Sequence, residues 1–345
     1  MIITQVPFRM SFFGGGTDFP DFFNRHGGAV LSTTIDKYCY VNIKRLPHFF
    51  DYRNDITYSK KERVGSVDEI EHPAIRNALK YLGESDMVIS YDADLPARTG
   101  LGTSSSFAVA LLLGLHALRG EYIGKKRLAE EAIHLERDLC RESGGLQDQI
   151  AAAYGGLNII TFGENDFRVD PLVINTERRL QLNRNLLMFF SGISRYSFTI
   201  QQEHQQILSS RDKESQLRDM LALVEEAKTA IVRGNLDDFG LMLDHTWRLK
   251  RQVNSAVSTD EIDEIYQTAL NAGAVGGKLL GAGGGGFIVF YVRPGDQSRV
   301  LNALSKLKNI PFTFESGGAR VLYYSEETQV QKTTGTDLLN DNPES

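Results

Sequence analysis

The chain has 345 residues, of which 41% are hydrophobic and 24% are charged, the composition of an ordinary globular protein. Its formal net charge of −6 argues against a nucleic-acid partner, because binding to a phosphate backbone needs a clustered basic surface. The two cysteines, Cys39 and Cys140, have neither disulfide-framework nor zinc-site spacing and fit a reducing compartment. With no signal-peptide pattern and no apolar run of the ~20 residues that a membrane span needs, we expect a cytoplasmic protein that binds neither nucleic acid nor membrane.

Strand and helix patterns follow one another without strict alternation in the first half of the chain. They predict strands at 2–13, 29–45, 86–94 and 157–162, and helices at 72–82, 105–118, 125–140 and 146–154. A polar, turn-rich stretch at 163–185 predicts a domain boundary, which we place at residue 175.

The second half begins with a strand at 186–190 and continues mostly in helices. Helices are predicted at 196–209, 213–233, 236–250, 260–272 and 297–307, and strands at 287–292 and 320–324. We therefore expect an α+β fold of two domains, residues 1–175 and 176–327, because the strict alternation of a parallel-sheet fold is missing. The polar, uncapped stretch 328–345 predicts a disordered tail.

A glycine- and hydroxyl-rich segment starts at Pro96, after a predicted strand, and opens a predicted helix. Its core consists of Gly100, Leu101, Gly102, Thr103, Ser104, Ser105 and Ser106. At such a junction, free backbone N–H groups and the positive end of the helix dipole point at one spot, which suits a phosphate. The hydroxyls can add hydrogen bonds or a magnesium ligand. The alternative is an ordinary serine-capped helix after a flexible loop.

A second glycine cluster, Gly14–Gly16, ends the first predicted strand and is followed by Thr17 and Asp18. Consecutive glycines, among them Gly15 and Gly16, let another molecule approach the backbone closely. An aspartate beside them can accept hydrogen bonds from sugar hydroxyls. The alternative is a tight turn in which Thr17 and Asp18 cap the next element of the chain.

A third glycine run, Gly281–Gly286, follows Lys278 and formally contains G-x-G-x-x-G. A dinucleotide fingerprint follows a strand and opens a helix, whereas here a predicted strand comes after the glycines, so we reject a nicotinamide-cofactor fold. A run this dense is costly in folding entropy and predicts close backbone packing against a ligand or another loop. The motifs of P-loop proteins and of protein kinases are absent from the sequence.

Two carboxylates complete the candidate chemistry. Asp148 follows a double glycine at the start of a short predicted helix, where it is either a helix cap or a carboxylate near an acceptor hydroxyl. Glu136 precedes it by twelve residues and could supply a carboxylate for a metal, since one or two carboxylates with substrate phosphates form the usual magnesium arrangement.

In this order, the three glycine-bearing segments resemble the motifs of the GHMP small-molecule kinase family. Pro7–Asp18 is similar to the first motif, Pro96–Ser105 to the phosphate loop P-x3-G-L-G-S-S with Thr103 at the first serine, and Lys278–Phe287 to the third. Within the family, the chain most resembles kinases of D-glycero-D-manno-heptose 7-phosphate. That likeness rests on Phe22–Leu31, Gly144–Gln149, Gly192–Arg195 and Gly276–Lys278.

The resemblance implies two α+β domains with an active site in the cleft between them, and ATP and Mg²⁺ as cofactors. It implies that the loop from Gly100 to Ser106 wraps the triphosphate, and that Ser104 and Glu136 hold magnesium. Asp148 would accept or orient the proton of the attacking hydroxyl. Arg9 would stand near the transferring phosphoryl group, where a fixed guanidinium stabilises negative charge.

The resemblance also implies a small-molecule substrate, a sugar phosphate, phosphorylated on its anomeric hydroxyl to the 1,7-bisphosphate, for nucleotide-activated heptose and surface polysaccharide. Sugar contacts are expected from Gly15, Gly16, Thr17, Asp18, Gly283 and Gly284. For the substrate's own phosphate, Arg195 is the first candidate, followed by Arg25 and Lys37. Two alternatives stay open: a kinase of an unphosphorylated sugar such as fucose, and a regulator that binds sugar and ATP without turnover.

Overall fold

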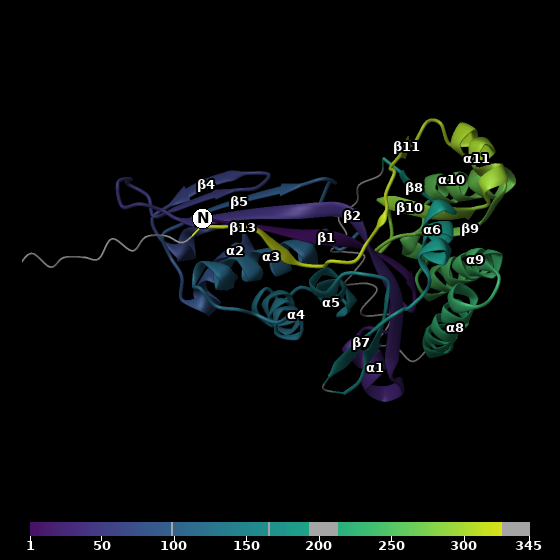
Figure 1. The fold of residues 1–345 in the computed structure, drawn as a ribbon, viewed down its shortest axis with the longest axis horizontal. Coiled ribbons are helices and arrows are strands. Elements are labelled where there is room, and N and C mark those ends of the chain that lie inside the picture. The colour runs from purple at the N-terminus through teal and green to yellow at the C-terminus, as the bar shows by residue number, and fades with distance from the viewer. Residues whose placement is uncertain (98, 165, 193–212, 326–345) are drawn as a thin grey trace, which may run out of the picture.

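The computed structural model describes residues 1–97, 99–164, 166–192 and 213–325 (Figure 1). These residues form a nine-stranded sheet and a four-stranded sheet, each packed with helices, so the expected α+β fold is confirmed. The predicted helix at 196–209 and the predicted tail at 328–345 lie outside the described residues. None of the helices in the described part is long and apolar enough to cross a membrane.

The larger sheet contains strands from both ends of the chain. Its strands are β1 (Ile2–Phe13), β2 (Gly28–Arg45), β3 (Asn54–Thr57), β4 (Lys61–Val64), β5 (Met87–Ala93), β6 (Asn158–Phe162), β7 (Phe167–Pro171), β12 (Phe314–Glu315) and β13 (Arg320–Tyr324). The long strand β2 pairs with β1 along its length, with β6 near its start and with β5 near its end, all antiparallel.

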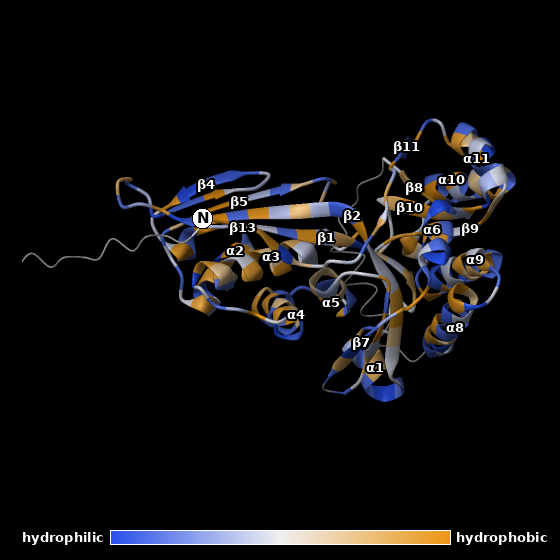
Figure 2. Cartoon of the chain, in the orientation of Figure 1, coloured by the Kyte–Doolittle hydropathy of each residue, from blue (hydrophilic) through white to orange (hydrophobic). Residues whose placement is uncertain are grey.

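Helices cover one face of this sheet (Figure 1). They are α2 (Pro73–Leu82), α3 (Thr103–Leu118), α4 (Lys125–His134) and α5 (Gln147–Tyr154), while α1 (Pro20–His26) follows β1. Figure 2 colours much of α3 as apolar, and most of its residues are buried, so it is a core helix. After α4, a π-helical turn spans Leu135–Leu139 and contains Glu136.

The smaller sheet has the order β11-β8-β10-β9. Its strands are β8 (Leu186–Phe190), β9 (Ala274–Leu279), β10 (Phe287–Val292) and β11 (Lys308–Asn309). The helices of this part are α6 (Thr176–Arg184), α8 (Glu214–Val232), α9 (Leu236–Val253), α10 (Asp260–Asn271) and α11 (Gln297–Ala303). Helix α9 packs onto the end of β1, where the Phe239 ring meets Phe12 and Phe13 edge-on, with ring centroids 5.2 Å apart in both pairs.

The strand pairing differs from the predicted division at one point. β13 pairs with β1 and β12 with β2, so these strands complete the N-terminal sheet although the predicted division put them with residues 176–327 (Figure 1). A strand pattern reveals the strand but not its long-range partner. The boundary at residue 175 stays a prediction.

The third glycine run packs against the phosphate-type loop. The backbone N–H of Phe287 donates to the Thr99 carbonyl over 3.1 Å. Gly281 has a φ of +71°, and a Cβ there would lie 2.3 Å from the Cα of Gly100. The sequence predicted that this run packs against a ligand or another loop, and in the structure it packs against the phosphate-type loop.

We expect Gly281→Ala to destabilise the chain more than Gly120→Ala, measured by urea unfolding. The two glycines have nearly equal φ angles, +71° and +72°, but nothing lies within 4 Å of a Cβ at Gly120. The control therefore measures only the loss of stability from placing alanine in a left-handed backbone conformation, about 1–2 kcal/mol. Gly281→Ala should add about 1–3 kcal/mol for overpacking against the neighbouring loop. Equal losses would contradict this packing.

Candidate active site

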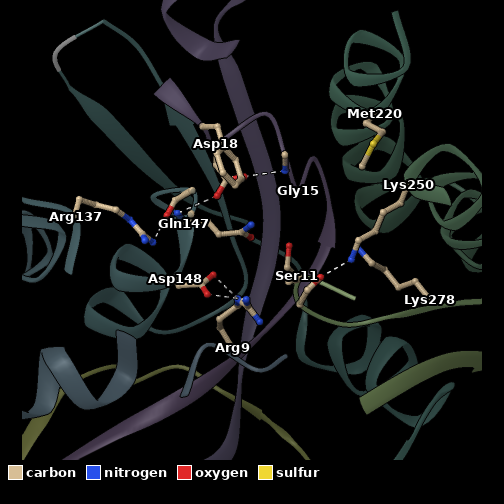
Figure 3. Close-up of a pocket in the computed structure, with 16 residues that line it drawn as sticks. Arg9, Ser11, Gly15, Asp18, Arg137, Gln147, Asp148, Met220, Lys250 and Lys278 are labelled. Atoms are coloured by element: carbon tan, nitrogen blue, oxygen red, sulfur yellow. Dashed lines mark hydrogen bonds and ion pairs between the residues drawn. The ribbon is translucent and has the colours of Figure 1, made fainter. Parts of the chain in front are cut away.

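A pocket opens between the two parts of the molecule and holds about 690 Å³ of empty space, part of it open to solvent (Figure 3). The N-terminal part supplies Arg9, Ser11, Gly15, Gly16, Asp18, Phe19, Arg137, Gly144, Gly145, Gln147 and Asp148. The C-terminal part supplies Met220, Lys250, Lys278, Gly281 and Ala282. Several of these residues belong to the motifs that the sequence singled out, which makes this pocket the candidate active site.

Arg9 and Asp148 form a two-pronged ion pair at the pocket. Nε and Nη2 of Arg9 donate to the two carboxylate oxygens of Asp148 over 2.7 and 2.8 Å, and Nη1 donates to the Gly100 carbonyl over 2.6 Å. The Arg9 side chain is 5% exposed and that of Asp148 is 25% exposed. Arg9 lies in the middle of β1 and Asp148 in the first turn of α5. A strand, a loop and a helix thus meet at one guanidinium, with the carboxylate still reachable from the pocket.

The phosphate-type loop ends in the N-terminus of α3. Gly102, with a φ of 71°, occupies the N-cap position and provides no side-chain cap. The structure therefore differs from the alternative of a serine-capped helix, and the first N–H groups of α3 lie at an end where helices bind anions. Two other positions hold the loop together, because Ser106 donates to the Pro7 carbonyl and Thr99 to the Pro96 carbonyl.

The structure brings Ser104 and Glu136 together. Oγ of Ser104 donates to one carboxylate oxygen of Glu136 over 2.9 Å, and Oγ of Ser105 to the other over 2.6 Å. Nε2 of Gln149 also donates to Glu136, whose residue is 2% exposed. Among the described residues no cationic side chain pairs with this buried carboxylate, and the buried Oε1 of Gln149 has no hydrogen-bond partner.

These groups fit a hard divalent cation, because Mg²⁺ prefers carboxylate, hydroxyl and phosphate oxygens. Ser104 is exposed whereas Ser105 is buried, so the Ser104 hydroxyl is the one that can reach a ligand beside the loop.

Asp18 points into the pocket from the first glycine cluster. Its carboxylate accepts from the Gly16 N–H over 2.9 Å and from the Gln147 N–H over 3.3 Å. Burial, the largest cause, and the neighbouring Asp148 raise the pKa of Asp18 above its ordinary value. Gly145 must lack a side chain, since a Cβ there would lie 1.9 Å from an Asp18 oxygen.

Not all predicted sugar contacts reach the pocket. Thr17 is fully buried, and its hydroxyl donates to the carbonyls of Gly14 and Ala29, so it ties the loop to β2. Gly283 packs against Val257, whose carbonyl accepts from the Gly284 N–H. Gly15 and Gly16 do line the pocket.

The predicted phosphate-binding cations are Arg195, Arg25 and Lys37. Arg195 lies outside the described residues. Arg25 pairs with Glu214, and Lys37 with the adjacent Asp36, and neither lines the pocket.

The sequence analysis did not assign a role to Lys250 or Lys278. Lys278 is 4% exposed and donates to the Phe12 carbonyl over 2.8 Å, and Lys250 is 8% exposed and donates to the Gly281 carbonyl. Burial lowers the pKa of Lys250 to about 7, with Arg9 as the second cause, and lowers that of Lys278 well below its usual range. In the sequence, Lys278 could have been recognised by its place shortly before the glycine run. Nothing in the sequence marks Lys250 as a pocket residue, because a lysine in an amphipathic helix is normally solvated.

Comparisons with known proteins now identify the family. The model of the GHMP kinases N terminal domain matches residues 70–156, and that of the GHMP kinases C terminal matches residues 227–309. The chain is 30% identical over 335 residues to D-glycero-alpha-D-manno-heptose 7-phosphate kinase of Campylobacter jejuni, covering 92% of this chain and 98% of that protein. The chain belongs to the GHMP kinase family.

Two further similarities agree with this membership. The chain is 24% identical to the bifunctional fucokinase/GDP-fucose pyrophosphorylase of Arabidopsis thaliana, over 86% of this chain but only 30% of that protein. The fold matches the crystal structure of a D-glycero-D-manno-heptose 1-phosphate kinase from Bacteroides thetaiotaomicron with a TM-score of 0.76, 24% identity, and coverage of 94% of this chain and 100% of that one.

We expect Lys250→Met to raise the stability of this GHMP kinase, and more at low pH than at high pH. The pKa of Lys250 falls from 10.5 to about 7 on folding, so the folded chain holds this proton more weakly than the unfolded chain. Its cost to stability is therefore full below about pH 7 and fades as the pH rises toward 10.5.

Urea unfolding at about pH 6 and about pH 9 checks this expectation, with the larger gain at the lower pH. Lys228→Met is the matched control, because Lys228 pairs with Glu225 on the surface and should change stability little at either pH. A gain of the same size at both pH values would contradict the assignment of a buried, destabilised ammonium.

Proposed function

We propose that this chain is an ATP- and Mg²⁺-dependent sugar kinase that phosphorylates the anomeric hydroxyl of D-glycero-D-manno-heptose 7-phosphate to the 1,7-bisphosphate. The observation that carries the proposal is the Arg9–Asp148 ion pair, which joins the phosphate-type loop to the pocket. The choice of sugar rests on the 30% identity to the heptose 7-phosphate kinase of Campylobacter jejuni.

The chemistry needs little beyond positioning and charge neutralisation, as phosphoryl transfer generally does. The acceptor hydroxyl would lie against the exposed part of Asp148, whose carboxylate takes the proton as the oxygen bonds to the γ-phosphorus and the bond to ADP breaks. Arg9 would hold that carboxylate in place and stabilise the charge of the transferring group, since a guanidinium stays protonated.

The phosphate loop and the Ser104–Glu136 pair would hold the nucleotide. The N-terminus of α3 offers its N–H groups to the phosphates. Ser104 and Glu136 would hold Mg²⁺, which neutralises phosphate charge when bound.

Asp18 and Gln147 are the groups best placed to contact sugar hydroxyls. Asp18 lines the pocket, and the buried Oε1 of Gln147 has no hydrogen-bond partner among the described residues. A sugar hydroxyl could donate to that amide oxygen, while Asp18 fixes the ring orientation.

The first test is ADP release with ATP and Mg²⁺ against heptose 7-phosphate, unphosphorylated heptose, mannose, fucose and galactose. Turnover with heptose 7-phosphate and little with the others supports the proposal. Preference for a free sugar, such as fucose, would overturn the substrate while leaving the kinase chemistry. Nucleotide binding without turnover of any sugar would favour a regulator.

We expect Asp148→Asn to lower kcat by roughly a hundred- to ten-thousand-fold, because the amide cannot take the proton of the acceptor. ATP binding should stay near wild type, since the phosphate loop is intact. Asp138→Asn is the matched control, because this exposed aspartate pairs only locally with His134. Steady-state kinetics with the sugar found in the panel gives the comparison, and near-normal turnover by Asp148→Asn would remove Asp148 from this role.

A further inference from the structure

The wall of the pocket opposite Asp18 carries two buried lysines. Lys250 comes from α9 and Lys278 from β9, and Figure 3 shows both amino ends directed toward the region of Ser11. Each ammonium has one backbone carbonyl as acceptor, that of Gly281 for Lys250 and that of Phe12 for Lys278. An ammonium has three N–H donors, so two on each lysine remain for a ligand.

Neither lysine has a counter-charge within the described residues. No carboxylate forms an ion pair with either one there, although both are more than nine-tenths buried. The two carboxylates that line the pocket are already engaged: Asp148 by Arg9, and Asp18 by two backbone N–H groups. Burying two like charges side by side is costly, and such a cost is typical of a site that a ligand of opposite charge completes.

The position of the pair distinguishes the anion it would take. The lysines line the same pocket as Asp18, Gln147 and Asp148, the groups that would hold the acceptor sugar. Arg137 is the remaining basic residue of the pocket besides Arg9 and the two lysines. Its Nη1 and Nη2 donate to the carbonyls of Glu142 and Gly145, and these bonds hold the glycine loop in front of Asp18.

We infer that Lys250 and Lys278 form the subsite for the phosphate that the acceptor sugar already carries, and so determine the preference for a phosphorylated over a free sugar. This inference rests on the proposed function, because it presupposes a sugar phosphate as acceptor. It assigns to Lys250 and Lys278 the recognition that the sequence analysis gave to Arg195, Arg25 and Lys37. A phosphate dianion placed there accepts the remaining ammonium N–H groups in charge-assisted hydrogen bonds.

The test compares wild type, Lys250→Met, Lys278→Met and the surface control Lys228→Met. Initial rates are measured with heptose 7-phosphate and with unphosphorylated heptose, at saturating ATP. Each pocket variant should raise KM for the phosphorylated sugar by roughly 10- to 100-fold, the scale of a lost charge-assisted hydrogen bond. KM for the free sugar and for ATP should change little. Equal losses with both sugars, or a rise in KM for ATP, would overturn the subsite.

A binding readout separates this inference from the proposed function. Trp247 is the only tryptophan in the chain, and its ring centroid lies 5.9 Å from Nζ of Lys250. Inorganic phosphate should change its fluorescence in wild type and in Lys228→Met, and not in Lys250→Met. If the sugar panel shows no phosphorylated acceptor, the proposed function fails, while a phosphate response that Lys250→Met abolishes still supports the anion subsite. Absence of that response in wild type would overturn it.

Thermal unfolding shows whether each variant folds. Methionine nearly matches the length of lysine and removes a buried charge, so both pocket variants should unfold at or above the wild-type temperature. If one variant is unfolded, the other carries the kinetic comparison alone, because each lysine is expected to affect the same KM.

Discussion

The arrangement of this site depends on the guanidinium of Arg9. Its planar fork binds both oxygens of Asp148 while its third nitrogen binds the Gly100 carbonyl, and its own backbone N–H donates to the Leu101 carbonyl. One side chain therefore links helix α5 to the phosphate-type loop, and both of these segments lie far from β1 in sequence. A lysine could not replace it, because an ammonium lacks the rigid two-pronged geometry. Even Gly102 serves this contact, since a Cβ there would lie 3.1 Å from Cγ of Arg9.

Charge in the pocket is distributed asymmetrically around that fork. On the N-terminal side, Asp18 is held by backbone N–H groups, and burial raises its pKa, whereas the C-terminal side offers Lys250 and Lys278. The N-terminal part contributes two carboxylates and two arginines to the pocket, and the C-terminal part contributes the two lysines. The phenylalanine contacts of α9 with β1, together with the glycine run on the phosphate loop, hold the two walls in register.

The sequence predicted best where a residue's role is set by its immediate neighbours. The helix after the phosphate-type loop, the strand at 287–292 and the carboxylate Asp148 all depend on local pattern or motif, and each lies where it was expected. The sequence could not predict which distant strands pair with each other. The pairing of β13 with β1, for example, joins residues more than 300 positions apart. Thr17 was predicted to contact the sugar, but its hydroxyl is hydrogen-bonded to the carbonyls of Gly14 and Ala29. A motif position does not reveal whether a side chain points out of its own loop or into it.

Three buried polar atoms without hydrogen-bond partners among the described residues indicate what the structure still requires. Oγ of Ser11 and Oε1 of Gln147 belong to residues that line the pocket, and Oε1 of Gln149 belongs to the side chain that donates to Glu136. Buried polar groups in folded proteins nearly always have partners, because an unmet one costs about 1–3 kcal/mol. Other buried atoms of the described residues, such as Nδ2 of Asn54, also lack partners away from the pocket, but the cost of the three beside the pocket and the Ser104–Glu136 pair is one that a polar ligand there can remove. The same reasoning applies to the two buried lysines, which have no acidic partner among the described residues.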